Sequence, residues 1–269
     1  MEPLIAMTQQ HADSQTEAKL SAHGITKSFD GREVLHGVSF DVRGGEFLSI
    51  LGPSGCGKST ILRILIGLEQ PDAGHVVLDG KDITDAAPSK RHMGIVFQDY
   101  ALFENMTALE NVEYALRFDP ARRERRAQIA LDALASLGMG DYANKPVTGL
   151  SGGQMQRVSI ARTLALSPEV ILLDEPTSGL DADARLALRS QLKDIQSDHG
   201  TTMIFITHDQ EEAFALADRV MVMGDGSIHQ MDEPLRIVEN PADDYVRDFV
   251  VANLKTKYDS LARFASPLK

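Results

Sequence analysis

A glycine-rich loop around residue 55 constrains the fold of this chain more than any other segment. Residues 52 to 59 read GPSGCGKS, directly after the apolar run Phe47 to Leu51 and before a helical pattern over Thr60 to Leu68. In a strand, loop and helix of this spacing, backbone N–H groups curl around a phosphate, and the positive end of the helix faces the same anion. We therefore expect an α/β fold with a phosphate site. The expected contacts are Gly52, Pro53, Ser54, Gly55, Cys56, Gly57, Lys58, Ser59 and Thr60.

A second segment completes the expected site. The continuous apolar run Val170 to Leu173 predicts a buried parallel strand, and Asp174 and Glu175 follow it. Such a position lies at the strand edge where open α/β sheets bind ligands. We expect Lys58 to contact the β- and γ-phosphates of a nucleotide, and Ser59 and Asp174 to hold Mg²⁺. Glu175 is placed to orient or deprotonate the attacking water. An Asp-Glu pair could merely cap the next helix, but the matched glycine loop disfavours that alternative.

The third segment lies between the other two in sequence and reads LSGGQ over Leu150 to Gln154. Ser151, Gly152 and Gly153 open a predicted helix that continues to Arg162, so a second helix N-terminus is available to face a phosphate. Alone, Ser-Gly-Gly would indicate only a flexible linker or a helix cap. In this order, the three segments resemble the ATP-binding cassette (ABC) ATPase family, and the resemblance runs from about Leu20 to Met231.

This resemblance implies both a fold and an assembly. The implied fold is α/β: a P-loop NTPase (RecA-like) core with an N-terminal antiparallel β subdomain and an inserted α-helical subdomain. In that family, the loop matched by Ser151 to Gln154 closes on the γ-phosphate held by a second subunit. The resemblance therefore implies an ATP hydrolase that binds ATP and Mg²⁺ and works as a head-to-tail dimer with a second copy of itself.

Other residues match the family's motifs one by one. Gln98 matches the glutamine that senses Mg²⁺, and His208 matches the switch histidine that contacts the γ-phosphate. Phe29 stands where the family usually has a tyrosine that stacks on adenine; it keeps the aromatic face and lacks the hydroxyl. Residues 178 to 181 resemble the loop that crosses the dimer interface. The implied catalytic residues are Glu175, His208, Lys58 and Gln98; the implied metal ligands are Ser59, Gln98 and Asp174; the implied nucleotide contacts beyond the glycine loop are Phe29, Gln98, Ser151, Gly152, Gly153 and Gln154.

The order of polar, strand-like and helix-like stretches along the sequence predicts its domain organisation. Residues 1–19 are polar and are expected to be a disordered extension. Residues 20–235 form the expected ATPase domain, in which strand-like runs vanish over about 99–157 and helical stretches take over. This insertion is the expected helical subdomain. Residues 236–269 are expected to be a short helical tail. Asp79-Gly80 and Asp225-Gly226 predict hairpin turns.

Bulk properties narrow the class of partner. The 269-residue chain has a formal net charge of −12, which argues against nucleic acid as the main partner. The basic run Arg122 to Arg126 lacks interleaved aromatics and is expected to be a solvated helix face. No apolar run approaches the roughly 20 residues of a membrane helix, and the single cysteine, Cys56, fits a reducing compartment. Because it lies near a helix N-terminus, which can lower a thiol pKa, we hypothesise that its alkylation blocks ATP binding.

The main functional hypothesis is the ATP-binding subunit of an importer, peripheral at the cytoplasmic face of the inner membrane through a separate permease and served indirectly by a solute-binding protein. Residues 100 to 111 resemble the importer segment that lines the groove for a permease helix, although Tyr100, Leu102 and Phe103 could equally be subdomain core. Residues 234 to 249 resemble osmoprotectant importers, and residues 89 to 98 look equally like polyamine or phosphonate importers. The expected solute is therefore small and polar. The alternative is a soluble ABC-type ATPase acting on DNA, ribosomes or Fe–S assembly.

Overall fold

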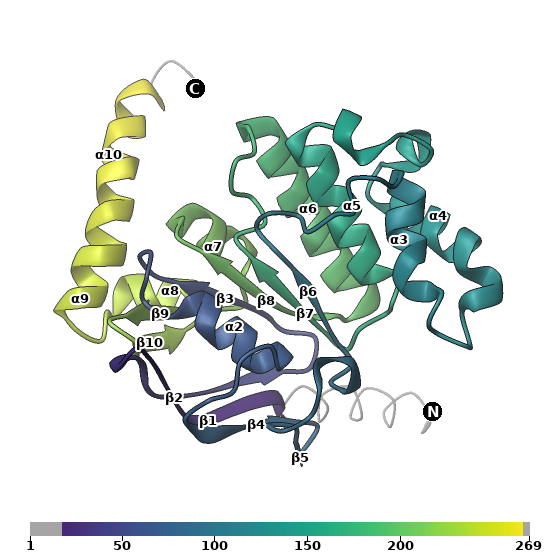
Figure 1. The fold of residues 1–269 in the computed structure, drawn as a ribbon. Helices are drawn as coiled ribbons and strands as arrows, with labels where there is room; N and C mark the ends of the chain where they lie inside the picture. Colours follow the sequence, from purple (N-terminus) through teal and green to yellow (C-terminus); the bar gives the residue numbers. More distant parts are fainter. Residues whose placement is uncertain (1–17, 266–269) are drawn as a thin grey trace, which may run out of the picture. The chain divides into compact units, whose positions relative to one another are not determined.

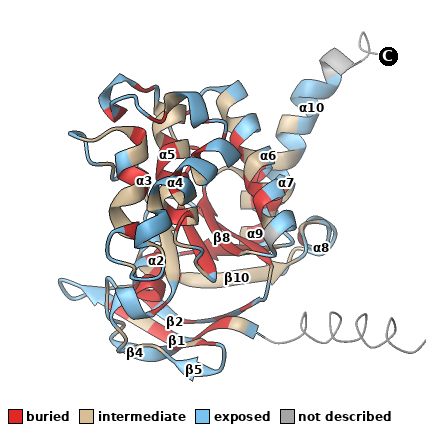
Figure 2. Cartoon of the chain, turned by 90° about the vertical axis from the view of Figure 1, so that its right-hand side faces the viewer, coloured by how far each residue is buried: buried red, intermediate tan, exposed pale blue. Residues whose placement is uncertain are grey.

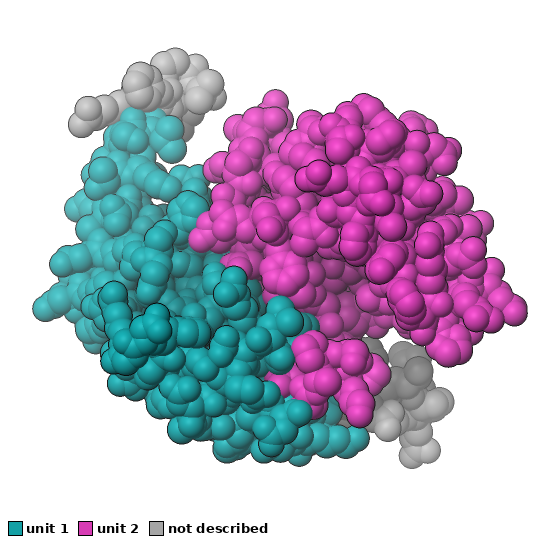
Figure 3. Space-filling view, viewed as in Figure 1, with its two compact units in different colours: residues 1–85, 205–269 teal, residues 86–204 magenta. Residues whose placement is uncertain are grey.

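The computed structural model describes residues 18–265 and divides into two compact units (Figure 3). Unit 1 comprises the residues up to 85 and those from 205 onward, and unit 2 comprises residues 86–204. The chain passes from unit 2 into unit 1 within strand β8 (Thr202–Thr207), whose residues are all buried (Figure 2). Most of the predicted N-terminal extension lies outside the described residues.

Unit 1 begins with an antiparallel sheet in the order β2-β1-β4-β5. Its strands are β1 (Ala18–Phe29), β2 (Arg32–Arg43), β4 (Ala73–Leu78) and β5 (Lys81–Asp82). β1 starts two residues before the predicted Leu20, because Ala18 pairs with Arg43 at the far end of β2. Asp79 and Gly80 have φ values of 47° and 71° between β4 and β5, which confirms the predicted hairpin turn. This sheet is the expected N-terminal antiparallel subdomain.

The remaining strands of unit 1 carry the glycine loop. β3 (Phe47–Leu51) runs parallel to β9 (Arg219–Gly224), and β9 pairs antiparallel with β10 (Ser227–Asp232). Every residue of β3 is buried, as expected of a strand with apolar side chains on both faces. The glycine loop follows β3 and leads into α2 (Lys58–Ile66), while α7 (Gln210–Leu216) follows β8.

The C-terminal part of unit 1 is helical (Figure 1). It consists of α8 (Pro234–Glu239), α9 (Asp244–Val246), a π-helical turn η5 (Arg247–Ala252) and α10 (Asn253–Ala265). Ile237, Val246 and Val250 are fully buried and pack in one core cluster with Leu51 of β3. We predicted that a separate tail begins at residue 236. In the structure these residues belong to the same packed core as the strands of unit 1, because their apolar side chains cover those strands.

Unit 2 is mainly helical and holds the parallel pair β6 (Met93–Val96) and β7 (Val170–Asp174). Its main helices are α3 (Ala108–Leu116), α4 (Arg126–Ser136), α5 (Gly152–Leu164) and α6 (Ala182–His199). Short 3-10 turns are η1 (Pro88–Lys90), η2 (Arg123–Arg125), η3 (Gly140–Tyr142) and η4 (Val147–Gly149). Across residues 18–265 the helices are too short or too polar to traverse a lipid bilayer.

Unit 2 is larger than the predicted helical insertion of residues 99–157. The reason is visible where α5 packs on β6: the Thr163 hydroxyl donates to the carbonyl of Ile95, and a side chain at Gly94 would lie 2.4 Å from the Thr163 methyl. Helix α5 and the strand before the insertion are thus packed together without room for an added carbon. The compact unit for this reason includes β6 and β7 as well as the helices.

Candidate functional site

The glycine loop has the backbone that the sequence pattern predicts. Gly55 and Gly57 have φ values of 83° and 100°, in the left-handed region that side chains disfavour. Gly57 is the N-cap of α2, so the loop runs directly into the positive end of that helix. A Cβ on Gly52 would lie 2.5 Å from the carbonyl oxygen of Met223. The loop therefore needs glycine at positions 55 and 57 for its backbone conformation, and at position 52 because the Met223 carbonyl lies too close for a side chain.

Lys58 is buried at the centre of this loop. Its ammonium group donates hydrogen bonds of 2.8 Å to the carbonyl oxygens of Gly52 and Pro53. The side chain is only 5% exposed, so the loop holds a full positive charge within its own backbone. This arrangement can attract an anion to the loop, as predicted for the β- and γ-phosphates. Ser59 is exposed in the first turn of α2.

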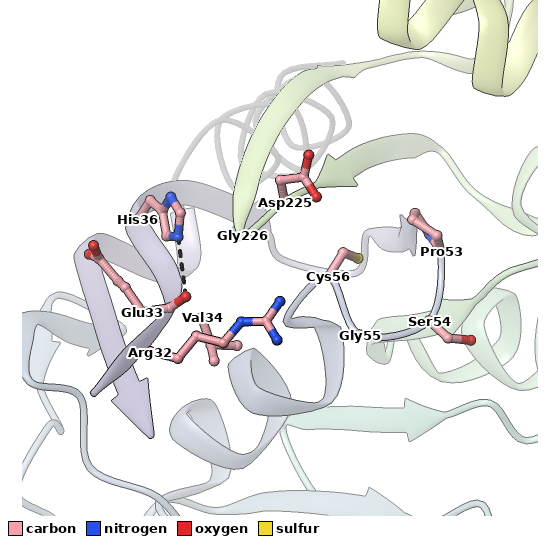
Figure 4. A pocket seen from close by; sticks show the side chains of 10 residues that line it. All are labelled: Arg32, Glu33, Val34, His36, Pro53, Ser54, Gly55, Cys56, Asp225 and Gly226. Atoms are coloured by element: carbon pink, nitrogen blue, oxygen red, sulfur yellow. Dashed lines mark hydrogen bonds between the residues drawn. The ribbon is translucent and has the colours of Figure 1, made fainter. Parts of the chain in front are cut away.

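A pocket of about 530 Å³ opens beside the loop within unit 1 (Figure 4). It has the size of a typical small-molecule site. β2 supplies one wall, the glycine loop another, and the β9–β10 turn the third. The lining residues are Arg32, Glu33, Val34, His36, Pro53, Ser54, Gly55, Cys56, Asp225 and Gly226.

Phe29, predicted to stack on adenine, does not line this pocket. It lies at the end of β1 and is 42% exposed, with the ammonium of Lys27 5.2 Å from its ring centroid. Stacking by Phe29 stays a prediction.

The structure contradicts the premise that the helix N-terminus lowers the pKa of Cys56, whereas the hypothesis that its alkylation blocks ATP binding stays a prediction. The thiol is buried, with 5% of the residue exposed, and a Cβ on Gly52 would lie 2.7 Å from its sulfur. Burial raises the pKa of Cys56, and this effect outweighs the lowering by the nearby Lys58 ammonium. Cys56 therefore lines the pocket as a largely buried thiol whose raised pKa disfavours the thiolate.

We expect iodoacetamide to modify Cys56 several-fold more slowly in the folded protein than in urea at the same pH, because the thiolate is the reactive species and is scarce when the pKa is raised. Mass spectrometry of the intact chain gives the rate directly, since Cys56 is the single cysteine. The rate should climb as the pH increases above neutrality. Equal rates in native buffer and urea would show that the thiol is accessible.

Unit 2 carries the predicted acidic pair. Asp174 is the last residue of β7, and Glu175 follows with a φ of 44°. Both are half-buried, whereas the β7 residues before them are fully buried. A non-glycine residue in the left-handed region costs free energy, and such residues cluster at functional sites. The strand end thus holds two neighbouring carboxylates, of which Glu175 has a left-handed backbone conformation that its residue type disfavours.

Gln98, two residues beyond β6, is also in unit 2. Its side-chain amide donates to the hydroxyl of Ser178 at 3.2 Å, within the segment predicted to cross a dimer interface. Both residues are thereby oriented by each other. The structure brings these two predicted functional segments together.

The segment after Gln98 has a feature that the sequence did not indicate. Tyr100 and Ala101 have consecutive positive φ values of 63° and 47°. Helix α5 holds them in place: Arg162 donates to the carbonyl oxygens of Ala101 and Tyr100 at 2.6 and 3.1 Å, and Ser159 donates to that of Tyr100 at 2.8 Å. Burial lowers the pKa of Arg162. Arg162 thus fixes the backbone of Tyr100 and Ala101. The sequence gives no indication of this contact, because neither tyrosine nor alanine favours a left-handed backbone.

The LSGGQ loop is a helix cap in this structure. Ser151 is the N-cap of α5, and its hydroxyl accepts from the backbone N–H of Gln154 at 3.3 Å. The Gln154 side-chain oxygen accepts from the N–H of Ser151 at 3.0 Å, which completes a capping box. A Cβ on Gly152 would lie 3.0 Å from the Tyr100 hydroxyl. The cap orders the loop, and this role is compatible with the predicted phosphate contact at the same helix end.

His208 lies in unit 1, exposed between β8 and α7. The residues on both sides of it are fixed. The Thr207 hydroxyl donates to the buried carboxylate of Glu212 at 2.8 Å and accepts from the N–H of Asp209 at 3.0 Å. Asp209 in turn caps α7 through Glu211 N–H. The histidine thus projects from a rigid helix entry.

The basic run is engaged in internal contacts. Arg122 donates to Asp119 at 3.1 Å and to the Leu166 carbonyl at 2.8 Å, and Arg126 lies 3.5 Å from Glu113. These bonds connect α3, α4 and the end of α5. Arg123 and Arg125 are exposed, as the predicted solvated face requires, whereas Arg122 and Arg126 are half-buried. The lack of a nucleic-acid role stays a prediction.

The predicted site residues are divided between the two units. Unit 1 holds Phe29, the glycine loop and His208, whereas unit 2 holds Gln98, residues 151–154, Asp174 and Glu175. Within each unit, they lie at strand ends or helix starts, as the strand, loop and helix pattern predicts.

Comparison with known proteins supplies the remaining evidence. The ABC transporter family matches residues 35–178. The chain is 45% identical over 244 residues to the spermidine/putrescine import ATP-binding protein PotA of Aliivibrio fischeri, covering 91% of this chain and 65% of that protein. It is 48% identical over 233 residues to the sulfate/thiosulfate import ATP-binding protein CysA 2 of Chromobacterium violaceum, covering 86% and 63%. The chain thus spans less than two thirds of the length of these relatives.

Solved structures agree. A dimeric, post-hydrolysis ATP-binding cassette, MJ0796 bound to ADP and Pi, matches with a TM-score of 0.73 at 35% identity, over 80% of this chain and 98% of that one. The cassette cbiO1 from Clostridium perfringens, part of the ABC transporter complex cbiONQ, matches with a TM-score of 0.76 at 29% identity, over 84% and 92%. The resemblance drawn from the three sequence segments is confirmed: the chain belongs to the ABC transporter family and has the fold of its ATP-binding cassettes.

Proposed function

We propose that this chain binds and hydrolyses ATP as the ATP-binding subunit of an importer. The observation that carries the proposal is the loop at residues 52–59, which combines left-handed glycines, a helix N-terminus and the buried ammonium of Lys58 beside a pocket of about 530 Å³. Such a loop is built for a phosphate chain, and the adjoining pocket has room for the nucleoside.

The donor set fits a Mg²⁺ ion, which binds hard oxygen ligands. The Ser59 hydroxyl, the Gln98 side-chain oxygen and the Asp174 carboxylate would hold it, and its charge would offset that of the phosphates. Lys58 binds the phosphates and Glu175 orients a water molecule and accepts its proton. The water oxygen forms a bond to the γ-phosphorus as the bond to the β,γ-bridging oxygen breaks, which releases ADP and phosphate. His208 stabilises the γ-phosphate.

A second copy of the chain supplies the LSGGQ loop to each nucleotide. The ordered N-terminus of α5 at Ser151 to Gln154 supports this assignment, because the positive end of a helix attracts an anion and the capping box engages the N–H groups of Ser151 and Gln154 but not those of Gly152 and Gly153. The related cassette MJ0796, solved as a dimer with ADP and Pi, supports the same arrangement.

An aromatic cluster on α3 and on the segments directly before and after it supports docking to a permease. The rings of Phe103 and Tyr114 lie 4.4 Å apart, and Tyr114 and Phe118 5.6 Å apart. Phe103 and Phe118 are 37% and 73% exposed, which is unusual for large apolar side chains in contact with one another. We propose that a cytoplasmic helix of a separate permease covers them, and that the chain lies at the cytoplasmic face of the inner membrane. A solute-binding protein would act from the opposite side.

The solute is small and polar. The named relatives import polyamines, which are cations, or sulfate and thiosulfate, which are anions, at 45% and 48% identity to this chain. Because the cassette is equally similar to proteins that serve solutes of opposite charge, selection of the solute resides in other subunits. A polyamine is one of the expected classes.

Phosphate release from Mg-ATP by the purified full chain tests the enzymatic part. We expect turnover that is abolished by EDTA and rises more than linearly with protein concentration, because two copies complete each site. Co-expression with a candidate permease should move the chain into the membrane fraction, and Phe118→Asp should reduce that recovery. Leu131→Asp, at another exposed apolar residue on α4, is the matched control. A chain that hydrolyses ATP but never co-fractionates with membranes would favour the soluble alternative.

A further inference from the structure

The C-terminal residues of unit 1 pack between the two segments that the proposed function assigns to the nucleotide. One fully buried cluster contains Leu51, directly before the glycine loop, and Ala213 of α7, five residues after His208. The same cluster contains Val246 and Val250 of the C-terminal segment. The end of the chain is therefore part of the core that supports both segments.

A direct hydrogen bond ties this segment to the start of α7. The Gln210 side-chain amide, 7% exposed, donates to the backbone carbonyl of Phe249 at 2.8 Å. Phe249 lies in the π-helical turn η5, a rare geometry that is frequent at functional sites. Gln210 is two residues from His208. The position of the helix entry after His208 is thus linked to the backbone of the C-terminal segment.

Ion pairs reinforce this link at the surface. The Lys257 ammonium on α10 lies 3.3 Å from the carboxylate of Glu211 and 3.6 Å from that of Asp209. Asp209 is the N-cap of α7 and is adjacent to His208. Two of the three acids at the start of α7, Asp209 and Glu211, therefore face one cation from the C-terminal helix.

The other end of the segment contacts the strand behind the glycine loop. The Tyr245 hydroxyl donates to the carbonyl oxygen of Met223 at 3.2 Å, the same oxygen that a Cβ on Gly52 would approach to 2.5 Å. Tyr245 is held between His229 and Phe249, with ring centroids 4.1 and 5.6 Å away. The segment thereby spans from the back of the loop to the entry of α7.

The segment is itself firmly anchored. Asp243 accepts from the N–H of Val246 at 2.8 Å and pairs with His229 at 2.7 Å. Both hydrogen bonds lower the pKa of Asp243, and the one from the Val246 backbone has the larger effect. The carboxylate is therefore charged at neutral pH and holds the start of α9 on β10.

We propose that residues 243–257, the C-terminal strap, position His208 for hydrolysis by fixing the helix entry that follows it to the back of the glycine loop. Gln210 and Lys257 are the positioning residues, and neither contacts the nucleotide. The inference rests on the proposed ATPase function. It predicts that loosening the strap slows turnover without weakening nucleotide binding, because the loop and pocket of unit 1 keep their own contacts.

Gln210→Leu tests the buried link, since leucine fills the space but cannot donate. We expect kcat for ATP to fall about five-fold, the effect of one internal hydrogen bond, with the KM and the affinity for a fluorescent ATP analogue unchanged. Asn253→Ala is the matched control: its amide donates to the same Phe249 carbonyl at 2.8 Å, but from within the strap, so it does not bridge to α7. Control and wild type should turn over alike.

A charge-reversal cycle tests the surface link without disturbing the core. Lys257→Glu should lower kcat about two-fold, and Glu211→Lys should do the same. The double variant should recover part of the loss, because Asp209 still faces residue 257. The loss in the single variants should shrink in high salt. If Gln210→Leu does not fold, as judged by its thermal transition, this cycle decides alone.

The possible results distinguish a failure of the strap proposal from a failure of the proposed ATPase function. Absence of ATP turnover in the wild type would count against the proposed function. Wild-type turnover with equal kcat in Gln210→Leu, equal losses in Asn253→Ala, or no recovery in the double charge reversal would each overturn the strap. A lower kcat with an unchanged KM, confined to the bridging variants, is the result we expect.

Discussion

Replacing Glu175 by glutamine is expected to leave ATP binding intact and to reduce hydrolysis by about 100-fold to 10,000-fold, the usual contribution of a general base. Glutamine has the same shape and keeps the backbone conformation, in which residue 175 has a φ of 44°. It cannot accept the proton of the attacking water. Phosphate release gives the loss of turnover, and equilibrium binding of a fluorescent ATP analogue shows that the site is retained.

The same variant should accumulate an ATP-bound dimer, because the closed state no longer ends in hydrolysis. Size-exclusion chromatography with Mg-ATP would show the larger species, and wild type would remain smaller. Glu124→Gln, an exposed carboxylate in the same unit, is the control and should behave as wild type. Near-normal turnover in Glu175→Gln would remove Glu175 from its proposed role.

Gly52→Ala is expected to lower the free energy of unfolding by about 1–3 kcal/mol, the usual cost of forcing extra volume into a packed interior, and to abolish measurable ATP binding. The new methyl would lie 2.5 Å from the Met223 carbonyl oxygen and 2.7 Å from the Cys56 sulfur. A backbone oxygen cannot rotate away, so the start of the loop must shift. Urea unfolding and nucleotide titration measure the two effects.

Gly140→Ala separates this clash from the general effect of the substitution. Its nearest neighbours would be 4.0 Å from the added carbon, at Ala135, and Gly140 is not among the residues with positive φ. That variant should unfold at the wild-type urea midpoint or slightly above it. If Gly52→Ala matched it in both stability and ATP affinity, the close approach of β9 to the loop would have no energetic consequence.

The strands and the glycine loop were predictable because their signals are local. β3 was expected at Phe47 to Leu51 and is found there, and the Asp225-Gly226 turn has the positive φ values that join β9 to β10. Continuous apolar runs and turn residues report burial and backbone directly. The helix predicted to open at Ser151 to Gly153 is also confirmed, since α5 begins at Gly152 with Ser151 as its N-cap.

The contacts that hold functional segments were not predictable in this way. Val246 and Val250 are four residues apart, which is a helical spacing, but that spacing does not indicate that they share a core with β3 or with Ile237, nine residues before Val246. Tyr100 and Ala101 adopt left-handed backbone that their residue types disfavour, and only Arg162 and Ser159, some 60 residues away in sequence, explain it. Such contacts depend on tertiary packing, which overrides local preference.

The capping box at Ser151 has a consequence for the energetics of assembly. A hydroxyl can accept one hydrogen bond and still donate another, so accepting from the Gln154 N–H leaves the Ser151 hydrogen for a phosphate oxygen. The loop that we propose contacts a partner's nucleotide is therefore already ordered in the single chain. Association then loses little conformational entropy at this loop, and the free energy of the new phosphate contacts goes into holding the two copies together.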